Sequence, residues 1–199
     1  MDFNIVVLCA FFYLLGSIPF GLILSKLFGF GDVRKFGSGN FGATNVLRTG
    51  SKSLALLVLF FDIAKGMLPL FILKNLNIFD YPIAFIYLIC CLPIIGHIFP
   101  VWLKFNGGKG VATYIGFLLS VNYLVAATFI LFWLLIALIS KYSSLASILS
   151  LIIILPISIY FSIEKEIIYI FSFISIIIII KHFSNILRLF NKTENKISF

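Results

Sequence analysis

Long apolar runs separated by short polar stretches are the dominant pattern of this chain. The runs extend over residues 4–27, 53–73, 81–100, 111–140, 148–163 and 167–180. Most of them approach or exceed the ~20 apolar residues with which a helix crosses a bilayer. Because a bilayer core offers no water to backbone polar groups, helices are the expected form of such runs. The pattern predicts an all-α fold, a polytopic integral membrane helix bundle.

The run over residues 111–140 leaves the number of helices open. It carries no charge over 30 residues, which is long for one ordinary span and short for two, and Asn122 lies near its middle. A short helical hairpin that turns near Asn122 gives about seven transmembrane helices, two of them short. One long tilted span gives six.

The distribution of basic residues favours seven helices. In that arrangement twelve of the fifteen Lys and Arg residues face the cytoplasm, as the positive-inside rule selects. These twelve are Lys26, Arg34, Lys35, Arg48, Lys52, Lys104, Lys109, Lys141, Lys181, Arg188, Lys192 and Lys196. The N-terminus then lies outside and the C-terminus in the cytoplasm, and the polar stretches with candidate chemistry share the cytoplasmic face.

Composition argues against an ordinary soluble domain. Hydrophobic residues make up 62% of the chain and charged residues 11%, whereas soluble domains carry roughly 25% charged residues. The basic residues that give the net charge of +8 lie between apolar runs, which indicates membrane topology and anionic substrates rather than nucleic acid. We expect one membrane-embedded domain over residues 1–199. The basic tail from Lys181 is expected to be an aqueous helix or a frayed end.

The most polar stretch, Gly31–Arg48, is the first candidate site. It contains four glycines, whose backbone N–H groups can converge on one point, and it carries Arg34, Lys35 and Arg48. This composition predicts a pocket for phosphate oxygens, and the alternative is a flexible surface loop. The spacing of its last three glycines matches a dinucleotide-binding fingerprint, but that motif requires a strand before it, and apolar membrane runs flank it here. Pro19 is expected to kink the run that precedes this stretch.

The Gly107–Gly110 segment, with Lys109 as its charge, is interpreted as a second anion-binding segment, and the alternative is a glycine hinge. Asp62 and Lys65 lie three residues apart within an apolar run, a spacing that allows them to pair. Such a pair either supports the site or accompanies a lysine that reaches for the interface.

The two histidines are treated separately. The structural and functional interpretations of His97 are equally weighted. His182 lies three residues before Asn185, so both can share one helix face and point at a ligand.

Two motifs of related chemistry are absent from the sequence. No H-x-x-x-x-D pair is present, so the histidine–aspartate arrangement of the large glycerolipid acyltransferase family is missing. No D-x-x-D-G cluster is present for metal-dependent phosphoalcohol transfer, and few acids are expected on the cytoplasmic side. The sequence therefore predicts no metal and no cofactor.

Several motifs together resemble those of the bacterial acyl-phosphate:glycerol-3-phosphate acyltransferase family, PlsY. The resemblance is carried over the whole chain, in order, by Asp32–Arg34 with Gly37–Asn45 and Arg48, by Asp62-x-x-Lys65-Gly66-x-x-Pro69, by Gly96-His97-x-x-Pro100 with Gly107–Thr113, by Tyr142–Ser147, and by His182-x-x-Asn185 through Glu194. It implies a multi-pass enzyme of the bacterial plasma (inner) membrane, with its active site facing the cytoplasm. The implied substrates are acyl phosphate and glycerol 3-phosphate, with membrane lipid as the surroundings and neither nucleic acid nor a protein partner.

The resemblance also implies roles for particular residues. Ser38, Asn45, Lys109 and His182 are expected to be catalytic. Substrate binding is expected from Gly37, Gly39, Asn40, Gly42, Thr44, Arg48, Gly107, Gly108, Ser144, Ser147 and Asn185, and support from Asp32, Arg34, Asp62, Lys65 and His97. Within these sets, the Gly37–Asn45 segment would hold acyl phosphate, while Arg48, Lys109 and the residues after Tyr142 would hold glycerol 3-phosphate. The alternatives are a carrier or channel for an organophosphate anion and an undecaprenyl- or phosphatidyl-transferring enzyme.

Overall fold

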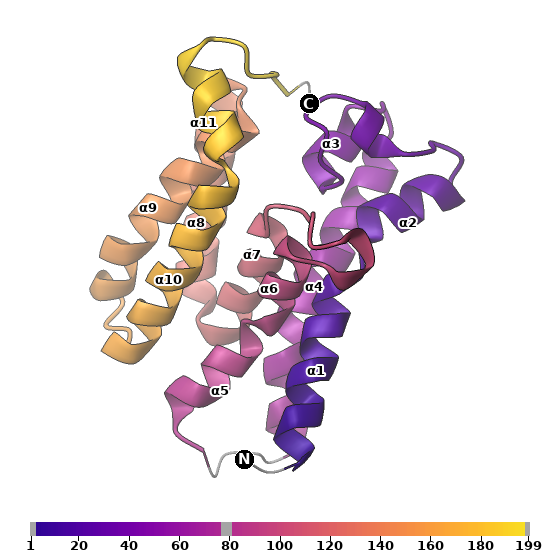
Figure 1. Cartoon of the computed structure of the whole chain (residues 1–199). Coiled ribbons are helices and arrows are strands. Elements are labelled where there is room, and N and C mark those ends of the chain that lie inside the picture. The colour runs from indigo at the N-terminus through magenta and orange to yellow at the C-terminus, as the bar shows by residue number, and fades with distance from the viewer. Residues whose placement is uncertain (1–2, 77–80, 198–199) are drawn as a thin grey trace. The chain divides into compact units, whose positions relative to one another are not determined.

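The computed structural model describes residues 3–76 and 81–197, and within these ranges the regular structure is entirely helical. The elements are α1 (Phe3–Ser17), α2 (Phe20–Leu27), η1 (Val33–Lys35), α3 (Ala43–Leu47), α4 (Lys52–Asn75), α5 (Ile83–Cys90), α6 (Leu92–Ile98), η2 (Val101–Leu103), α7 (Val111–Val121), α8 (Tyr123–Ser140), α9 (Ser143–Tyr160), α10 (Lys165–Lys181) and α11 (Phe183–Phe190), shown in Figure 1. The chain divides into two compact units, unit 1 (Met1–Val121) and unit 2 (Asn122–Phe199).

Four to six of these helical segments are long and apolar enough to cross a membrane. Four are Lys52–Asn75, Ile83–Leu103, Tyr123–Ser140 and Ser143–Tyr160. Two more arise if each bent pair counts as one span: α1 with α2, bent by 47°, and α10 with α11, bent by 57°. The expected all-helical membrane architecture is therefore confirmed. The expectation of one domain over residues 1–199 stays a prediction. Residues 1–2, 77–80 and 198–199 of that range lie outside the described residues.

Two expected helix breaks are present. The bend between α1 and α2 falls at the predicted proline, Pro19. The uncharged run over residues 111–140 is two helices rather than one, because the backbone at Asn122 is extended, with φ −153° and ψ 112°. The Asn122 side-chain oxygen accepts hydrogen bonds from the N–H groups of Leu124 and Val125, at 3.0 and 3.1 Å. This side chain caps the start of α8 and fixes the position of the break.

Unit 1 is built on close helix packing, and the closest approach joins α4 to α7. A Cβ atom added at Gly66 would lie 2.0 Å from the carbonyl oxygen of Thr113, and one added at Gly116 would lie 2.0 Å from that of Ile63. Small residues permit this backbone contact where lipid supplies no hydrophobic driving force. The α4–α7 interface therefore requires glycine on both helices.

The polar stretch Gly31–Arg48 is anchored in the core of unit 1. Its apolar members Val33, Phe41 and Val46 are buried and pack with Leu22 of α2 and Val58 of α4. A segment that buries several of its side chains in this way has one preferred conformation. The flexible surface loop considered above is therefore excluded for this stretch.

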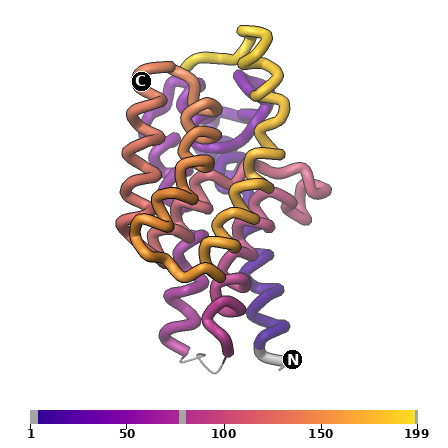
Figure 2. Tube along the Cα trace, turned by 90° about the vertical axis from the view of Figure 1, so that its left-hand side faces the viewer, coloured from indigo at the N-terminus to yellow at the C-terminus, as the bar shows by residue number. Residues whose placement is uncertain are grey.

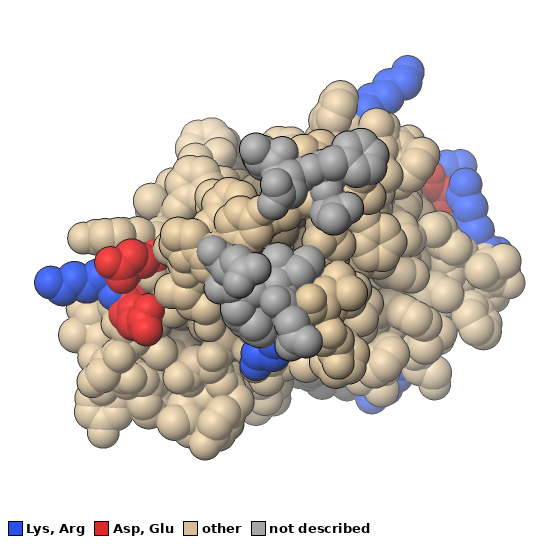
Figure 3. Space-filling model, turned by 90° about the horizontal axis from the view of Figure 1, so that it is seen from below, with Lys and Arg blue, Asp and Glu red and all other residues tan. Residues whose placement is uncertain are grey.

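Unit 2 consists of α8, α9 and α10, which lie side by side (Figures 1 and 2), and of α11, which bends away from α10. The tail beyond α11 folds back, since the Ile197 N–H donates to the Lys141 carbonyl at 2.7 Å. Of the two alternatives for the tail, a helix is present in α11, and the described residues beyond it are held by this bond. In Figure 3, which views the molecule from below, most of the visible residues are neither acidic nor basic.

Replacement of Gly116 by valine is expected to destabilise unit 1, because the new side chain would meet the backbone of α4. Overpacking of this kind costs about 3 kcal/mol. The midpoint of thermal unfolding in detergent measures the loss. Gly29→Asn is the control, since Gly29 has φ +81° but nothing within 4 Å of an added Cβ, and asparagine tolerates this conformation. Equal midpoints for both variants would contradict the packing argument.

Candidate functional site

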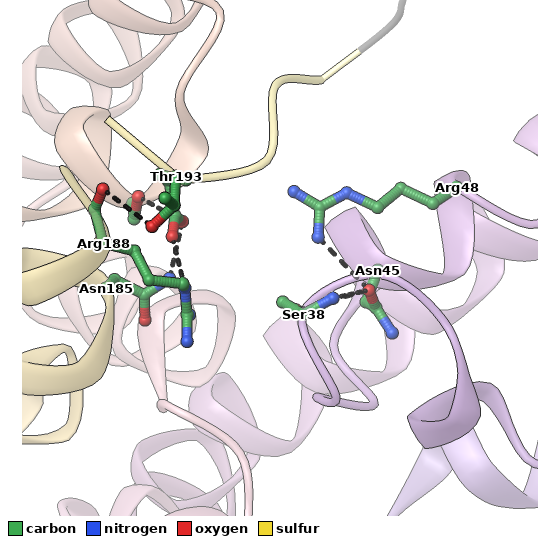
Figure 4. Close-up of polar contacts among 8 residues, drawn as sticks. Ser38, Asn45, Arg48, Asn185, Arg188 and Thr193 are labelled. Atoms are coloured by element: carbon green, nitrogen blue, oxygen red, sulfur yellow. Dashed lines mark hydrogen bonds and ion pairs between the residues drawn. The ribbon is translucent and has the colours of Figure 1, made fainter. Parts of the chain in front are cut away.

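The carboxamide of Asn45 organises the first polar stretch (Figure 4). Its oxygen accepts from the Ser38 N–H at 2.9 Å, from the Ser38 hydroxyl at 3.3 Å and from Arg48 Nη1 at 3.3 Å. Its nitrogen lies 2.6–3.1 Å from the carbonyl oxygens of Val33, Phe36 and Asn40. Asn45 is 2% exposed. An amide has two N–H groups, and these serve three carbonyls here, so Asn45 shapes the loop from inside.

The glycines of this loop have different backbone roles. Gly37 and Gly39 have φ of +55° and +73°, and a Cβ at Gly37 would lie 2.4 Å from the Asn45 side-chain oxygen. Gly42 has an ordinary φ of −70°, precedes α3, and has nothing within 4 Å of an added Cβ. The first two glycines permit the turn that Asn45 holds, whereas Gly42 leaves open space beside the backbone.

Several N–H groups of the loop are available to an anion. The Gly39 N–H donates to the Phe36 carbonyl at 3.1 Å, so this predicted contributor is already used. Within residues 3–76 and 81–197, no protein acceptor is found for the N–H groups of Gly37, Asn40 or Gly42. Thr44 lies in the first turn of α3 and is half-buried. Backbone N–H groups without a protein acceptor can bind phosphate oxygens.

The charge of Arg34 is largely neutralised by Asp32. Its guanidinium donates through Nε and Nη2 to the Asp32 carboxylate, and the shortest contact is 2.7 Å. The hydrogen bonds from the Arg34 side chain lower the pKa of Asp32 to about 2. The Asp32 carboxylate also accepts from the Arg34 N–H and caps η1. The excess positive charge of the loop therefore comes from Lys35 and Arg48.

The segment around Lys109 differs from the predicted second anion-binding segment. The Gly107 and Gly108 N–H groups donate to the carbonyls of Ile98 and His97, at 3.2 and 3.0 Å. A Cβ at Gly108 would lie 2.1 Å from His97 Nε2. These glycines are required for close packing on the end of α6, and their amides are not available to phosphate. Lys109 itself is half-buried and remains the charged group of this segment.

The predicted pairing of Asp62 with Lys65 is confirmed. The Lys65 Nζ atom lies 2.8 Å from Asp62 Oδ1, and the two side chains are 2% exposed or less. His97 Nδ1 lies 3.6 Å from the same carboxylate oxygen. Burial excludes the alternative of a lysine that reaches for the interface.

Glu194 forms hydrogen bonds with predicted site residues of unit 2, and the sequence analysis did not assign it a role. Its carboxylate accepts from the Ser144 hydroxyl at 2.7 Å, from Asn185 Nδ2 at 2.6 Å and from Arg188 Nε at 2.7 Å. Figure 4 labels two of these partners, Asn185 and Arg188. Burial raises the pKa of Glu194, but these hydrogen bonds outweigh burial, and the pKa lies below its ordinary value. The sequence did offer a signal for this role. Glu194 is the one acidic residue in the basic tail after Lys181, and it lies within the tail motif that carries the family resemblance.

His182 and Asn185 are both held in place by hydrogen bonds within unit 2. His182 Nδ1 lies 2.8 Å from the Ile178 carbonyl, so it carries the proton and Nε2 is an acceptor in the neutral ring. Asn185 donates to an ionised carboxylate, which fixes the orientation of its amide. Its Oδ1 atom is buried without a partner among the described residues. Since buried polar atoms are nearly always hydrogen-bonded, this oxygen is a candidate acceptor for a ligand donor.

Ser147 is used within unit 2. Its hydroxyl accepts from Trp133 Nε1 at 2.9 Å and donates to the Ser143 carbonyl at 2.9 Å. These contacts join α8 to α9. The predicted role in substrate binding stays a prediction, whereas the observed contacts are structural.

The helical architecture, with its apolar helices and its two polar clusters at helix breaks, is that of an integral membrane protein. A family model described as glycerol-3-phosphate acyltransferase matches residues 6–192. Glycerol-3-phosphate acyltransferases of Mesorhizobium japonicum and Ehrlichia ruminantium are each 47% identical to this chain, over 99% and 100% of its length and 98% of their own. The chain belongs to the glycerol-3-phosphate acyltransferase family.

Solved structures agree with this assignment. The chain is similar to the crystal structure of PlsY, an integral membrane glycerol 3-phosphate acyltransferase, in its glycerol 3-phosphate form. The TM-score is 0.88 at 37% identity, over 98% of this chain and 96% of that one. The lysophosphatidic acid form of the same protein gives a TM-score of 0.86 at 36% identity. The chain therefore belongs to the PlsY type of glycerol-3-phosphate acyltransferase.

Replacement of Glu194 by glutamine is expected to loosen the tail of unit 2. The hydrogen bonds to the carboxylate contribute about 1–2 kcal/mol that the neutral amide loses. Because the folded-state pKa is lowered, this contribution is present above the ordinary pKa of 4.5 and is lost as the pH falls through the folded-state pKa.

Hydrogen exchange at the Ile197 amide, which bonds Lys141, measures the effect. Exchange should be faster in Glu194→Gln than in the unsubstituted protein at pH 7, and the difference should narrow towards pH 4. Glu166→Gln, in the exposed first turn of α10, is the control. Equal protection in all three proteins at pH 7 would mean that the carboxylate does not hold the tail.

Proposed function

We propose that this chain transfers a fatty acyl group from acyl phosphate to the 1-hydroxyl of sn-glycerol 3-phosphate, releasing lysophosphatidic acid and inorganic phosphate. The reaction would be the first step of bacterial phospholipid synthesis. The observation that carries the proposal is the full-length likeness to a glycerol 3-phosphate acyltransferase whose structures have glycerol 3-phosphate and lysophosphatidic acid forms. Acyl phosphate as donor rests on the motifs quoted above.

The loop around Asn45 is the proposed donor site. Its N–H groups at Gly37, Asn40 and Gly42, which have no acceptor among the described residues, would bind phosphate oxygens and stabilise the oxyanion of the tetrahedral intermediate. Ser38 stays in this role because its hydroxyl makes only a 3.3 Å contact. Asn45, which sequence reasoning placed in contact with the donor, would act instead by holding these groups in place.

In the proposed reaction the acceptor oxygen attacks the carbonyl carbon of the acyl phosphate. The carbon–oxygen bond to phosphate then breaks, and the departing phosphate takes the proton of the attacking hydroxyl. Acyl phosphate is already activated, so no nucleophilic serine or cysteine of the protein is needed. Arg48 and Lys109 would supply positive charge to the phosphate of glycerol 3-phosphate.

His182 and Asn185 are the proposed recognition groups for hydroxyls of the acceptor. Asn185 presents the acceptor atom Oδ1, to which a glycerol hydroxyl can donate, and the His182 ring, held by the contact of its Nδ1 with the Ile178 carbonyl, would bind through Nε2. Ser144, whose proton goes to Glu194, keeps lone pairs that can accept as well. These acceptor atoms would bind the hydroxyl groups of the acceptor substrate, and they would repel a phosphate group.

We further propose seven spans, with α7 as a short seventh, the N-terminus outside, and the C-terminus in the cytoplasm. The active site would then face the cytoplasm at the inner membrane, where glycerol 3-phosphate is available. This topology rests on the basic-residue distribution, and on the break at Asn122 that divides the uncharged run.

Purified protein should release phosphate from palmitoyl phosphate only when glycerol 3-phosphate is present. The release should persist with metal chelated and fail with acyl-CoA as donor. Phosphate release and lysophosphatidic acid formation are measured together in detergent or lipidic phase. Failure of a folded preparation to release phosphate would favour the carrier alternative, which flux of glycerol 3-phosphate into vesicles would test.

Gly42→Ala is the sharpest test of the donor site. The added methyl group meets no protein atom and the backbone is unstrained, so stability should be unchanged. A donor phosphate that approaches this backbone would be displaced, and the KM for palmitoyl phosphate should rise about tenfold, with a fall in kcat.

Lys109→Ala is the matched comparison, since it should instead raise the KM for glycerol 3-phosphate and lower the rate by about 10²-fold or more. The thermal midpoint of each variant controls for folding. Wild-type donor kinetics in Gly42→Ala would remove this backbone from the donor site.

A further inference from the structure

A cluster of three buried ionisable side chains lies between the two polar loops of unit 1. Asp62 is at its centre, with Lys65 Nζ at 2.8 Å and His97 Nδ1 at 3.6 Å from Oδ1. All three side chains are at most 5% exposed. The proposed reaction assigns no step to any of them.

On one side, the cluster holds the break between α1 and α2. Lys65 Nζ donates to the Ile18 carbonyl at 3.1 Å and lies 5.5 Å from the centre of the Phe20 ring. The start of α2 in turn touches the donor loop, since a Cβ at Gly21 would lie 1.7 Å from the Phe41 carbonyl oxygen. A change at Lys65 is therefore transmitted through α2 to the loop around Asn45.

On the other side, the cluster holds the segment around Lys109. His97 packs its ring 5.6 Å from that of Phe41 in the donor loop. The same imidazole contacts Gly108, where no Cβ fits, and the His97 carbonyl accepts from the Gly108 N–H. His97 thus contacts both the donor loop and the residue before Lys109.

Stability alone does not explain this cluster. A buried ion pair is often no more stabilising than apolar residues of similar volume, because desolvation offsets the attraction between the charges. The directional hydrogen bond from Lys65 to the Ile18 carbonyl, however, fixes a distance that apolar packing does not.

We propose that Asp62, Lys65 and His97 are positioning residues that set the distance between the phosphate-binding loop at residues 37–45 and Lys109. The proposal rests on the proposed function, because it assigns the two loops to the two substrates. None of the three residues touches a reacting atom, and each acts through the backbone that it holds.

The test is the double variant Asp62→Asn/Lys65→Met, which removes both charges together. Single variants leave one buried charge unpaired and are expected to fold poorly, whereas the double variant should fold. Its kcat/KM for glycerol 3-phosphate should fall about tenfold to hundredfold. The reason is that a methionine side chain has no N–H to donate to the Ile18 carbonyl. The loop groups that position the substrates would then shift, and small shifts of such groups lower the reaction rate steeply.

Leu73→Ala is the matched control. Leu73 is 2% exposed and lies on α4, eleven residues beyond Asp62 and near the end of the helix that is farther along the chain from residues 31–48. It should lower the thermal midpoint without changing KM or kcat. His97→Gln keeps a side-chain N–H near Asp62 but removes the ring that packs on Gly108 and Phe41, and should reduce kcat/KM independently of the double variant.

A second readout is binding of glycerol 3-phosphate, measured as the rise in thermal midpoint at saturating ligand. The rise should be smaller in the double variant and in His97→Gln than in Leu73→Ala. Wild-type kinetics and a wild-type rise in both cluster variants would overturn the proposal. An unsubstituted protein that binds glycerol 3-phosphate without acyl transfer would contradict the proposed function, while the binding comparison would still decide the role of the cluster.

Discussion

Backbone polar groups freed at a helix break must be satisfied inside the protein, because hydrocarbon offers them nothing. Three breaks of this chain are each matched by a dedicated side chain. Lys65 serves the Ile18 carbonyl between α1 and α2, and Asn122 serves two N–H groups at the start of α8. Asn45 serves three carbonyls of the irregular stretch between α2 and α4. At each of these places the helix is interrupted, and a polar side chain forms hydrogen bonds with the backbone groups that the interruption exposes.

This constraint links architecture to chemistry. A membrane enzyme needs irregular backbone to present N–H groups to phosphate, and irregular backbone needs internal hydrogen-bond partners. Asn45 meets both needs by holding carbonyls inward, while the N–H groups of Gly37, Asn40 and Gly42 have no acceptor in the described part of the chain. Glu194 has a comparable place in unit 2, since it fixes the Asn185 amide, whose oxygen has no partner among those same residues. In both clusters, a buried side chain organises the groups assigned to the substrates.

Much of this arrangement was predictable because it depends on local sequence. The spacing of Asp62 and Lys65 on one helix face, the break at Asn122 and the kink at Pro19 each follow from neighbouring residues. The use of the Gly107 and Gly108 amides was not predictable, because their acceptors belong to the end of α6 and only the folded loop brings them within reach.

Glu194 was missed for a similar reason, since its partner Ser144 lies 50 residues away in sequence. Glycine-rich composition indicates where backbone is free to bend, and tertiary contacts decide which N–H groups remain available. The arrangement around Asn45 also has a consequence for how this loop can evolve. Aspartate has nearly the same shape as asparagine, yet it would present an ionised oxygen where the amide nitrogen now meets three carbonyl oxygens. Even the conservative replacement of Asn45 by aspartate should therefore not be tolerated. Substitutions in relatives of this sequence should accumulate instead at exposed loop positions such as Lys35 and Phe36.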